Sequence, residues 1–341
     1  MKRIQNSEFR IQNEINQIVR YFGNFDYVPT VEEIHRFYPK KISRDTVGEY
    51  SKKVQSLKFK VQSFEKEREK RKRTSEDKIK LIKRFIELLS RFPQIKLVGL
   101  SGTVAMNNAK KNDDIDLFII TAKDRLWTGR IVAILLANLL NLRRTRDSSN
   151  VIASEPRKAG ERGNLVTNKT IYINGITSSS RSSGIPRNDI TVKDKVCLNL
   201  FFDEKNLQVP KYKQTEYVAH EVLQMKPLVD KDNIYQRFIQ ANEWVFGFFP
   251  NAEKASPRFK VQSAKLQFKM QSYSKNFKPL TIIFNFSFLT FNLIMDGIEV
   301  LTKRLQLALI NRHRTTEMIT DTQLWFFPDD YERKIPMNQT R

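Results

Sequence analysis

Two aspartates, Asp114 and Asp116, begin the β-forming segment DIDLFIIT and stand two positions apart. Side chains alternate across a strand, so both carboxylates are expected to project from the same face. Ile115 and Leu117 then point into a core on the other face. Two carboxylates held side by side repel each other unless a cation lies between them. Magnesium suits this position, because it takes carboxylate oxygens and keeps coordination sites for substrate phosphates.

A glycine turn precedes the aspartates. The sequence predicts a short strand at Ile95–Leu100, a turn at Ser101-Gly102-Thr103 and a brief helix from Val104. Gly102 lets a phosphate approach the backbone closely, and Thr103 offers a hydroxyl and a backbone N–H. Ser101 either contacts the phosphate or simply occupies the turn. The positive end of the brief helix would face the same place. We therefore expect nucleotide binding at the turn and metal binding on the next strand.

The stretch VGLSGTVAMNNAKKNDDIDLFII resembles the signature of the DNA polymerase β nucleotidyltransferase superfamily, which is a Gly-Ser turn, a spacer and Asp-x-Asp on a strand. Gly102-Thr103 matches the turn, with Thr in place of Ser, and Asp114 and Asp116 match the aspartates. The resemblance implies an α+β fold with a mixed sheet and flanking helices. It also implies a nucleoside triphosphate bound with two Mg²⁺ ions, Mn²⁺ being the alternative metal. The implied reaction transfers a nucleoside monophosphate to a hydroxyl and releases pyrophosphate.

The wider sequence is similar to nucleotidyltransferase-domain proteins of candidate-phylum bacteria. The similar phrases are KLVGLSGTVAM, DDIDLFIIT, LWTGR, KVCLNLFFDE and AHEVLQMKPL. This similarity implies no particular acceptor, so RNA, a protein hydroxyl and a small molecule stay open. The alternative function is a catalytically inactive scaffold of the same fold that binds nucleotide or nucleic acid.

The superfamily often carries a third carboxylate on a later strand, which is expected here at Val196–Phe202. By alternation, Asn199, Phe201 and Asp203 share one face. Asp203 is the predicted third catalytic and metal-binding carboxylate, and Glu204 is a weaker choice. If Asn199 takes the position instead, the acceptor hydroxyl lacks a general base, which favours the scaffold.

Other polar residues near these motifs have simpler interpretations. We expect Asp113 to be solvated, because alternation turns it away from the face of Asp114. Lysines in the spacer and arginines in the following helix are also expected at the surface, although they are alternative phosphate contacts; these are Lys110, Lys111, Arg125 and Arg130. His220 and Glu221 lie on a predicted helix with apolar neighbours, so a packing histidine is favoured over a catalytic one.

Three regions are expected along the chain. Residues 1–75 predict a winged-helix-like module, residues 76–210 the nucleotidyltransferase domain, and residues 211–341 a helical C-terminal domain. Residues 147–193 are rich in Ser, Arg, Asn and Gly and predict a flexible insertion.

The winged-helix prediction depends on three short helices followed by an extended segment at 57–64. Thr30 and Glu33 form a capping-box pattern at the second of these helices. A generic three-helix cap is the alternative. The pentapeptide FKVQS occurs at 59–63 and 259–263, and FKMQS at 268–272, at a spacing that makes no solenoid.

Charge and composition limit the partners. Sixty Lys and Arg against 37 Asp and Glu give a net charge of +23, which favours nucleoside triphosphates, nucleic acid or an anionic surface. Cys197 is the only cysteine, which excludes an intrachain disulfide and a cysteine-based zinc site. The three histidines lie far apart in the sequence, which argues against a histidine cluster. The opening residues contain no apolar core, so we expect a cytoplasmic protein.

The longest apolar stretch, Leu280–Met295, is sixteen residues and is broken by two asparagines and a serine. A membrane-spanning helix needs about 20 residues, so no integral span is predicted. A buried helix of the C-terminal domain is favoured over a helix lying on an anionic membrane surface.

Overall fold

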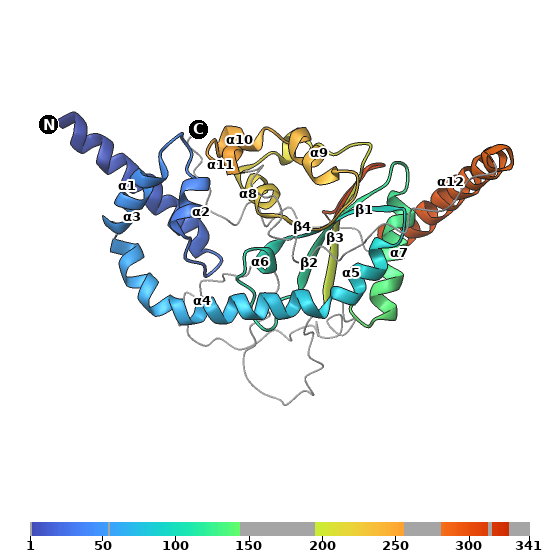
Figure 1. Ribbon diagram of the computed structural model, residues 1–341, viewed down its shortest axis with the longest axis horizontal. Coiled ribbons are helices and arrows are strands. Elements are labelled where there is room, and N and C mark those ends of the chain that lie inside the picture. The colour runs from blue at the N-terminus through green and yellow to red at the C-terminus, as the bar shows by residue number, and fades with distance from the viewer. Residues whose placement is uncertain (1, 54, 144–194, 256–280, 313–315, 327–341) are drawn as a thin grey trace, which may run out of the picture.

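Six strands form one open, mixed sheet in the order β4-β1-β2-β3-β6-β5 (Figure 1). The computed structural model describes residues 2–53, 55–143, 195–255, 281–312 and 316–326. Strands β2 and β3 are parallel, and all other neighbours are antiparallel. The strands are β1 (Ile95–Leu100), β2 (Ile115–Thr121), β3 (Val196–Asp203), β4 (Lys226–Asp230), β5 (Met318–Ile319) and β6 (Gln323–Trp325). The predicted α+β architecture, a mixed sheet with flanking helices, is confirmed.

Strand alternation divides the buried residues of β2 between two cores. Ile115, Leu117 and Ile119 face a core that is completed by helices α5 (Lys83–Ser90) and α7 (Leu126–Leu139). Phe118 and Ile120 face the opposite core, which contains residues of the N-terminal helices and of the helices that follow β3. Asp116 has the same parity as Phe118, so it lies on this second face.

The N-terminal helices are α1 (Lys2–Gly23), α2 (Val31–Arg36), α3 (Arg44–Lys53) and α4 (Gln55–Leu81). The Thr30–Glu33 capping box is confirmed, since the Glu33 N–H donates to Thr30 Oγ1 at 3.1 Å and the Thr30 N–H donates to Glu33 Oε2 at 2.8 Å. The predicted extended wing at 57–64 is wrong, because these residues lie within the long helix α4. The three predicted helices are therefore present, but the extended segment that a winged helix requires is not found at 57–64.

The C-terminal part is less helical than expected. Helix α8 (Glu216–Gln224) ends at the start of β4, so residues 226–230 form an edge strand rather than the end of a longer helix. Three short helices follow, namely α9 (Ile234–Ala241), α10 (Val245–Phe248) and α11 (Ala252–Ala255). Proline has no backbone N–H to donate to a ladder, and the position of β4 at the edge of the sheet explains how Pro227 is accommodated.

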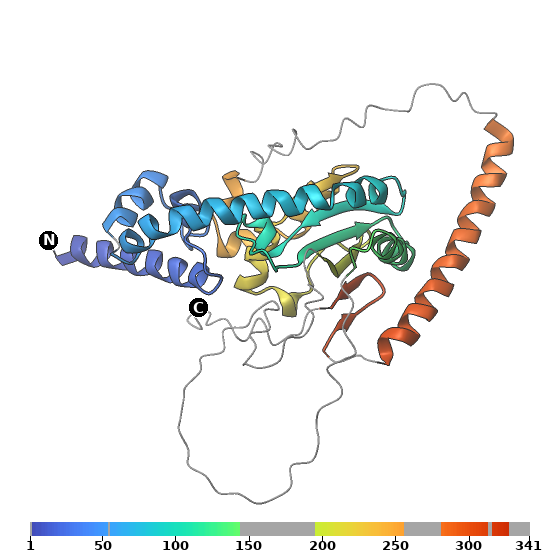
Figure 2. The same cartoon turned by 90° about the horizontal axis from the view of Figure 1, so that it is seen from below.

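The last helix, α12 (Thr281–Asn311), extends along α7 and away from the body of the molecule (Figure 2). Among the described helices, none combines the length and apolarity needed to cross a bilayer. The predicted insertion and the FKVQS and FKMQS copies at 259–263 and 268–272 lie outside the described residues.

Candidate functional site

The Gly102 turn and the Asp116 side chain are in direct contact. Gly102 begins the short helix α6 (Gly102–Ala105) with φ +64°, a backbone conformation that favours glycine. A Cβ atom at Gly102 would lie 2.6 Å from Asp116 Oδ2. The Ser101 N–H also donates to the Asp116 carbonyl oxygen at 3.0 Å. The structure therefore brings the predicted turn and the predicted strand carboxylate together.

Asp114 and Asp116 are both largely withdrawn from solvent, with 6% and 8% of their surfaces exposed. Asp114 directly precedes β2, and Asp116 is its second residue. Ile115, between them, belongs to the core on the far face. The apolar alternation of β2 thus fixes the side of the sheet on which the Asp116 carboxylate lies.

Asp113 links two parts of the loop between the Gly102 turn and Asp114 through its carboxylate. Its Oδ2 accepts from Thr103 Oγ1 at 3.0 Å and from the Lys110 N–H at 2.9 Å. Asp113 is therefore not merely solvated, as predicted, but ties both ends of the loop together. The Thr103 hydroxyl, predicted to contact nucleotide, donates to a carboxylate instead.

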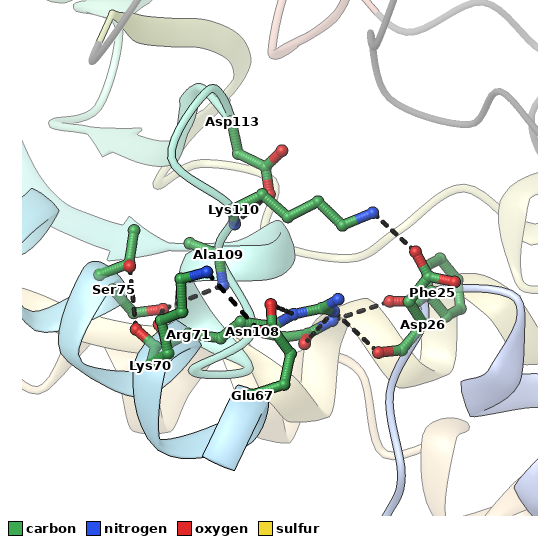
Figure 3. Close-up of polar contacts among 11 residues, drawn as sticks. Phe25, Asp26, Glu67, Lys70, Arg71, Ser75, Asn108, Ala109, Lys110 and Asp113 are labelled. Carbon is green, nitrogen blue, oxygen red and sulfur yellow. Dashed lines mark hydrogen bonds and ion pairs between the residues drawn. The ribbon is translucent and has the colours of Figure 1, made fainter. Parts of the chain in front are cut away.

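Helix α4 holds the same loop from outside (Figure 3). Arg71 donates to Asn108 Oδ1 at 2.9 Å and to the Asp26 carbonyl oxygen at 2.8 Å, and the Ala109 N–H donates to Ser75 Oγ at 3.1 Å. Lys78 Nζ donates to the carbonyl oxygens of Lys111 and Asp113 at 3.1 and 2.8 Å. These contacts position the residue that immediately precedes Asp114.

A groove of about 450 Å³ lies between α4 and this loop. Most of its cations already have protein partners, since Arg71 and Lys78 hold the loop and Lys110 pairs with Asp26 at 2.6 Å. The cations that line the groove therefore hold the loop in place. It is lined by Glu67, Lys70, Arg71, Thr74, Asp77, Lys78, Leu81, Ala109, Lys110 and Lys111.

Asp203 does not join the aspartate pair. It is paired in register with Thr121, five positions after Asp116, which is about 16 Å along a strand. Its carboxylate accepts from the Lys205 N–H at 2.8 Å and the Arg125 N–H at 3.3 Å. Burial raises the pKa of Asp203 to about 6, against these two hydrogen bonds. The prediction that Asp203 completes the metal site is corrected, and Glu204 follows it at the same end of β3.

The residue of β3 in register with Asp116 is Cys197, which is buried. Asn199 lies at the irregularity that follows, between the Asp116–Cys197 and Phe118–Leu200 pairs. Its carbonyl oxygen accepts from the Phe326 N–H at 2.9 Å. Strand β3 therefore places no carboxylate opposite Asp116.

Helix α8 brings a different carboxylate to the turn. Burial raises the pKa of Glu221 to about 7, and a hydrogen bond from the backbone of Gly102 acts against this shift. Lys226 follows nearby, in register with Leu100 at the end of β1, and its Nζ donates to Asn107 Oδ1 at 3.2 Å. Burial lowers the pKa of Lys226. No motif in the sequence predicts a catalytic or binding role for Glu221 or Lys226.

His220, beside Glu221, is a packing residue as predicted. Its ring is 2% exposed and stacks on Tyr21 with 4.0 Å between centroids. Burial, and then the charge of Arg36, holds the pKa of His220 well below its usual range. This packing attaches α8 to the N-terminal helices and so fixes the position of Glu221.

Arg125, the N-cap residue of α7, and Arg130 within α7 both contact helix α12. Arg125 pairs with Asp296 at 2.6 Å, and Arg130 donates to Gln306 Oε1 at 2.6 Å. Burial lowers the pKa of Arg130 to about 10. Both side chains bind α12, which corrects the expectation of free surface positions.

The donor set at the turn fits a hard divalent ion that is shared with a substrate. Magnesium is usually held by one or two carboxylates together with substrate phosphates, rather than by a complete protein cage. Asp114 and Asp116 are two carboxylates of this kind, and Gly102 has no side chain at the point where Asp116 Oδ2 meets the turn. Elsewhere in the described chain, as here, no three His, Cys, Asp or Glu side chains gather into a metal cage.

The comparisons with known proteins add no identification. No family model, curated protein or solved structure matches the chain.

Proposed function

We propose that the chain is a metal-dependent nucleotidyltransferase that moves a nucleoside monophosphate from a nucleoside triphosphate to a hydroxyl. The observation that carries the proposal is the contact between Gly102 and the Asp116 carboxylate, with Asp114 two residues earlier in the chain and also buried. A turn without a side chain, next to two buried carboxylates, is the arrangement that the superfamily signature implies. Mg²⁺ or Mn²⁺ bound by Asp114 and Asp116 would neutralise charge on the triphosphate and orient it.

The chain's own residues supply binding and orientation. The Thr103 backbone N–H is the candidate for a phosphate contact at the turn, because the Ser101 N–H donates to the Asp116 carbonyl oxygen and the Gly102 backbone hydrogen-bonds Glu221. Asp113 holds the loop in shape through the Thr103 hydroxyl. Lys226, at the same end of the sheet, adds a positive charge close to the turn. This charge and the overall excess of +23 favour a polyanionic substrate.

We propose that Glu221 is the general base that takes the proton from the acceptor hydroxyl. It hydrogen-bonds the Gly102 backbone from α8, whereas β3 places no carboxylate opposite Asp116. A general base must lie within hydrogen-bond reach of the hydroxyl that it deprotonates. Glu221→Gln is expected to lower kcat at least about tenfold while leaving nucleotide affinity within about twofold.

A catalytically inactive nucleotide-binding scaffold is the second candidate. The observation that favours it is the position of Asp203 at the far end of β3, which leaves Cys197 in register with Asp116. Without a carboxylate that receives the acceptor's proton, the same fold would bind nucleotide without turnover. Calorimetry showing Mg²⁺-dependent nucleotide binding, with no product from any acceptor mixture, would support this candidate.

The test is consumption of labelled nucleoside triphosphate with Mg²⁺ and a mixture of RNA, protein and sugar acceptors. Asp114→Asn and Asp116→Asn should each reduce consumption to below about one hundredth of wild type. Asp124→Asn is the matched control, because Asp124 is exposed, pairs with Lys205 and lies at the other end of β2. Equal turnover by wild type and Asp116→Asn would refute the assignment of the site.

A further inference from the structure

The groove between helix α4 and the loop that precedes Asp114, which we call the α4 groove, carries an excess of positive charge. Five of its ten lining residues are Lys or Arg, and two are acidic. One of these acids, Asp77, pairs at 3.1 Å with Lys80, which lies outside the groove. The hollow of about 450 Å³ is therefore positively charged, which favours an anionic ligand.

Two of the five cations are buried and hold the loop. Arg71 donates to Asn108 Oδ1 at 2.9 Å, and Lys78 Nζ donates to the carbonyl oxygen of Asp113 at 2.8 Å. Their positions are fixed by these contacts, so they contribute a constant positive field to the groove.

The other three cations are exposed, and a ligand can reach them. The Lys70 side chain is 77% exposed and lies 3.7 Å from Glu67. Lys110 comes from the loop on the other side and pairs with Asp26, and both of these side chains are more than half exposed (Figure 3). Lys111 is exposed and makes no ion pair within the described part of the chain. Exposed ion pairs contribute little to stability, so a phosphate can replace these carboxylates at small cost.

The form of the groove favours one strand of nucleic acid. From Glu67 to Leu81, α4 lines it over about 21 Å. A single strand carries a phosphate about every 3.4 Å, so about six phosphates fit along this length. The ten lining residues include no aromatic side chain, so the contacts would be with backbone phosphates and not with stacked bases. An anionic membrane presents a broad surface and does not reach into a hollow with two walls.

We propose that the α4 groove binds the phosphodiester backbone of a single-stranded nucleic acid. Residues 109–111 line the groove, and Asp114 follows three residues later, so a bound strand would lie beside the loop that leads to the aspartates. The role of this strand as the acceptor rests on the proposed function. Its binding needs neither metal nor nucleotide.

The test is binding of a short labelled RNA strand to the full-length chain, measured by fluorescence anisotropy at several salt concentrations without metal or nucleotide. The double variant Lys70→Gln, Lys111→Gln should bind at least about tenfold more weakly than wild type. The slope of log K against log salt should fall by about 1.4, because each lost phosphate contact on a single strand removes about 0.7.

The double variant Arg73→Gln, Lys80→Gln is the matched control. It removes the same charge from exposed positions of α4 outside the groove, and its affinity should stay within about twofold of wild type. Equal losses in the two double variants would overturn the proposal, because only the overall charge would then matter. A wild type that does not bind RNA at micromolar concentration in physiological salt overturns it as well.

Three further measurements separate the alternatives. Asp116→Asn should bind RNA as wild type does, so intact binding without nucleotide turnover would refute the proposed function alone. Single-stranded DNA that binds no more tightly than RNA supports the proposal, whereas a preference for duplex overturns it. Displacement of the RNA by a nucleoside triphosphate, or binding to anionic vesicles in place of RNA, would also overturn it.

Discussion

At the scale of single residues, the site depends on what Gly102 lacks. Its backbone has φ +64°, and the space where a side chain would begin is next to Asp116 Oδ2. The glycine therefore serves both the turn and the carboxylate. An alanine there would push against the flexible end of the Asp116 side chain, so the carboxylate would move before the backbone does.

Gly102→Ala is expected to cost about 1–3 kcal/mol of unfolding free energy, because an L-residue at positive φ is strained. Nucleotide turnover should fall further, by roughly 100-fold, because the oxygen proposed to bind the metal is displaced. Thermal unfolding and labelled nucleotide consumption measure the two effects. Gly247→Ala is the control, since nothing lies within 4 Å of the added carbon. Full activity in Gly102→Ala would show that Asp116 does not act at the turn.

Asp203 should make the stability of the fold depend on pH, because burial raises its pKa to about 6. A raised carboxyl pKa means that the folded state binds the proton more tightly than the unfolded state. Protonated Asp203 thus stabilises the fold fully below pH 4, and this stabilisation is lost as the pH rises through 6. The unfolding free energy is expected to fall by about 1–3 kcal/mol over this pH range. Asp203→Asn cannot titrate, so its unfolding free energy relative to wild type should improve between pH 4 and 7. Denaturant titrations across this range measure the difference; parallel pH profiles would contradict the prediction.

The aspartate pair was foreseeable from sequence, because alternation in DIDLFIIT fixes its face without reference to distant residues. The wrong prediction for Asp203 shows that alternation along a strand does not determine which ends of two strands lie side by side. Parity gives the face of a strand, but the parallel pairing of β2 and β3 decides which ends meet. Glu221 lies on a helix far along the chain, and no local pattern indicates that this helix packs against the Gly102 turn.

At the scale of elements, helix α12 caps the N-terminus of helix α7. Helix α7 starts at Leu126, and its N-cap residue, Arg125, provides no side-chain acceptor for the first N–H groups. Glu299 of α12 accepts from two of them, and a carboxylate at this end also interacts well with the helix dipole. The docking of α12 is therefore part of the stability of α7, and of the core face that α7 covers.

Glu299→Ala should lower the unfolding free energy by about 1–2 kcal/mol, since two N–H groups lose their acceptor. Chemical denaturation of the variant gives this value. Asp321→Ala is the comparison, because its side chain is 85% exposed and its ion pair with Lys303 is a surface contact. An equal effect of the two substitutions would contradict the capping role of Glu299.

Elements with a clear period were predicted well, and those set by distant contacts were not. The strands at 95–100 and 196–203 stand out as apolar β-forming runs between turns. Residues 57–64 have the same local character, yet they continue α4. Residues 226–230 contain a proline and little alternation, so only pairing with β1 makes them a strand. In both cases tertiary packing decides between conformations that the local sequence allows.

At the scale of the whole molecule, the N-terminal helices are not a detached module. Phe37 of the N-terminal part packs edge-to-face on Phe249, with 5.2 Å between ring centroids, and contacts His220 at 4.3 Å. Arg71 and Asn108 add a polar tie between α4 and the loop before Asp114. Residues 11–50 and 217–252 thus share a core with one face of the sheet.

Phe37→Ala is expected to cost about 3–5 kcal/mol and to lower one cooperative transition of the whole described structure. Scanning calorimetry checks both the size and the number of transitions. Phe9→Ala is the matched control, because Phe9 is 65% exposed and should leave the transition unchanged. Two separate transitions, of which Phe37→Ala moves only one, would show that the N-terminal helices unfold independently.

The most direct test of the site is crystallographic. Crystals soaked with Mn²⁺ and a non-hydrolysable nucleoside triphosphate analogue should show anomalous density at coordination distance from carboxylate oxygens of both Asp114 and Asp116, with the phosphates at Gly102. Manganese bound elsewhere, at Asp203 for example, or a nucleotide that avoids the Gly102 turn, would contradict the assignment of this turn and strand as a metal–nucleotide site.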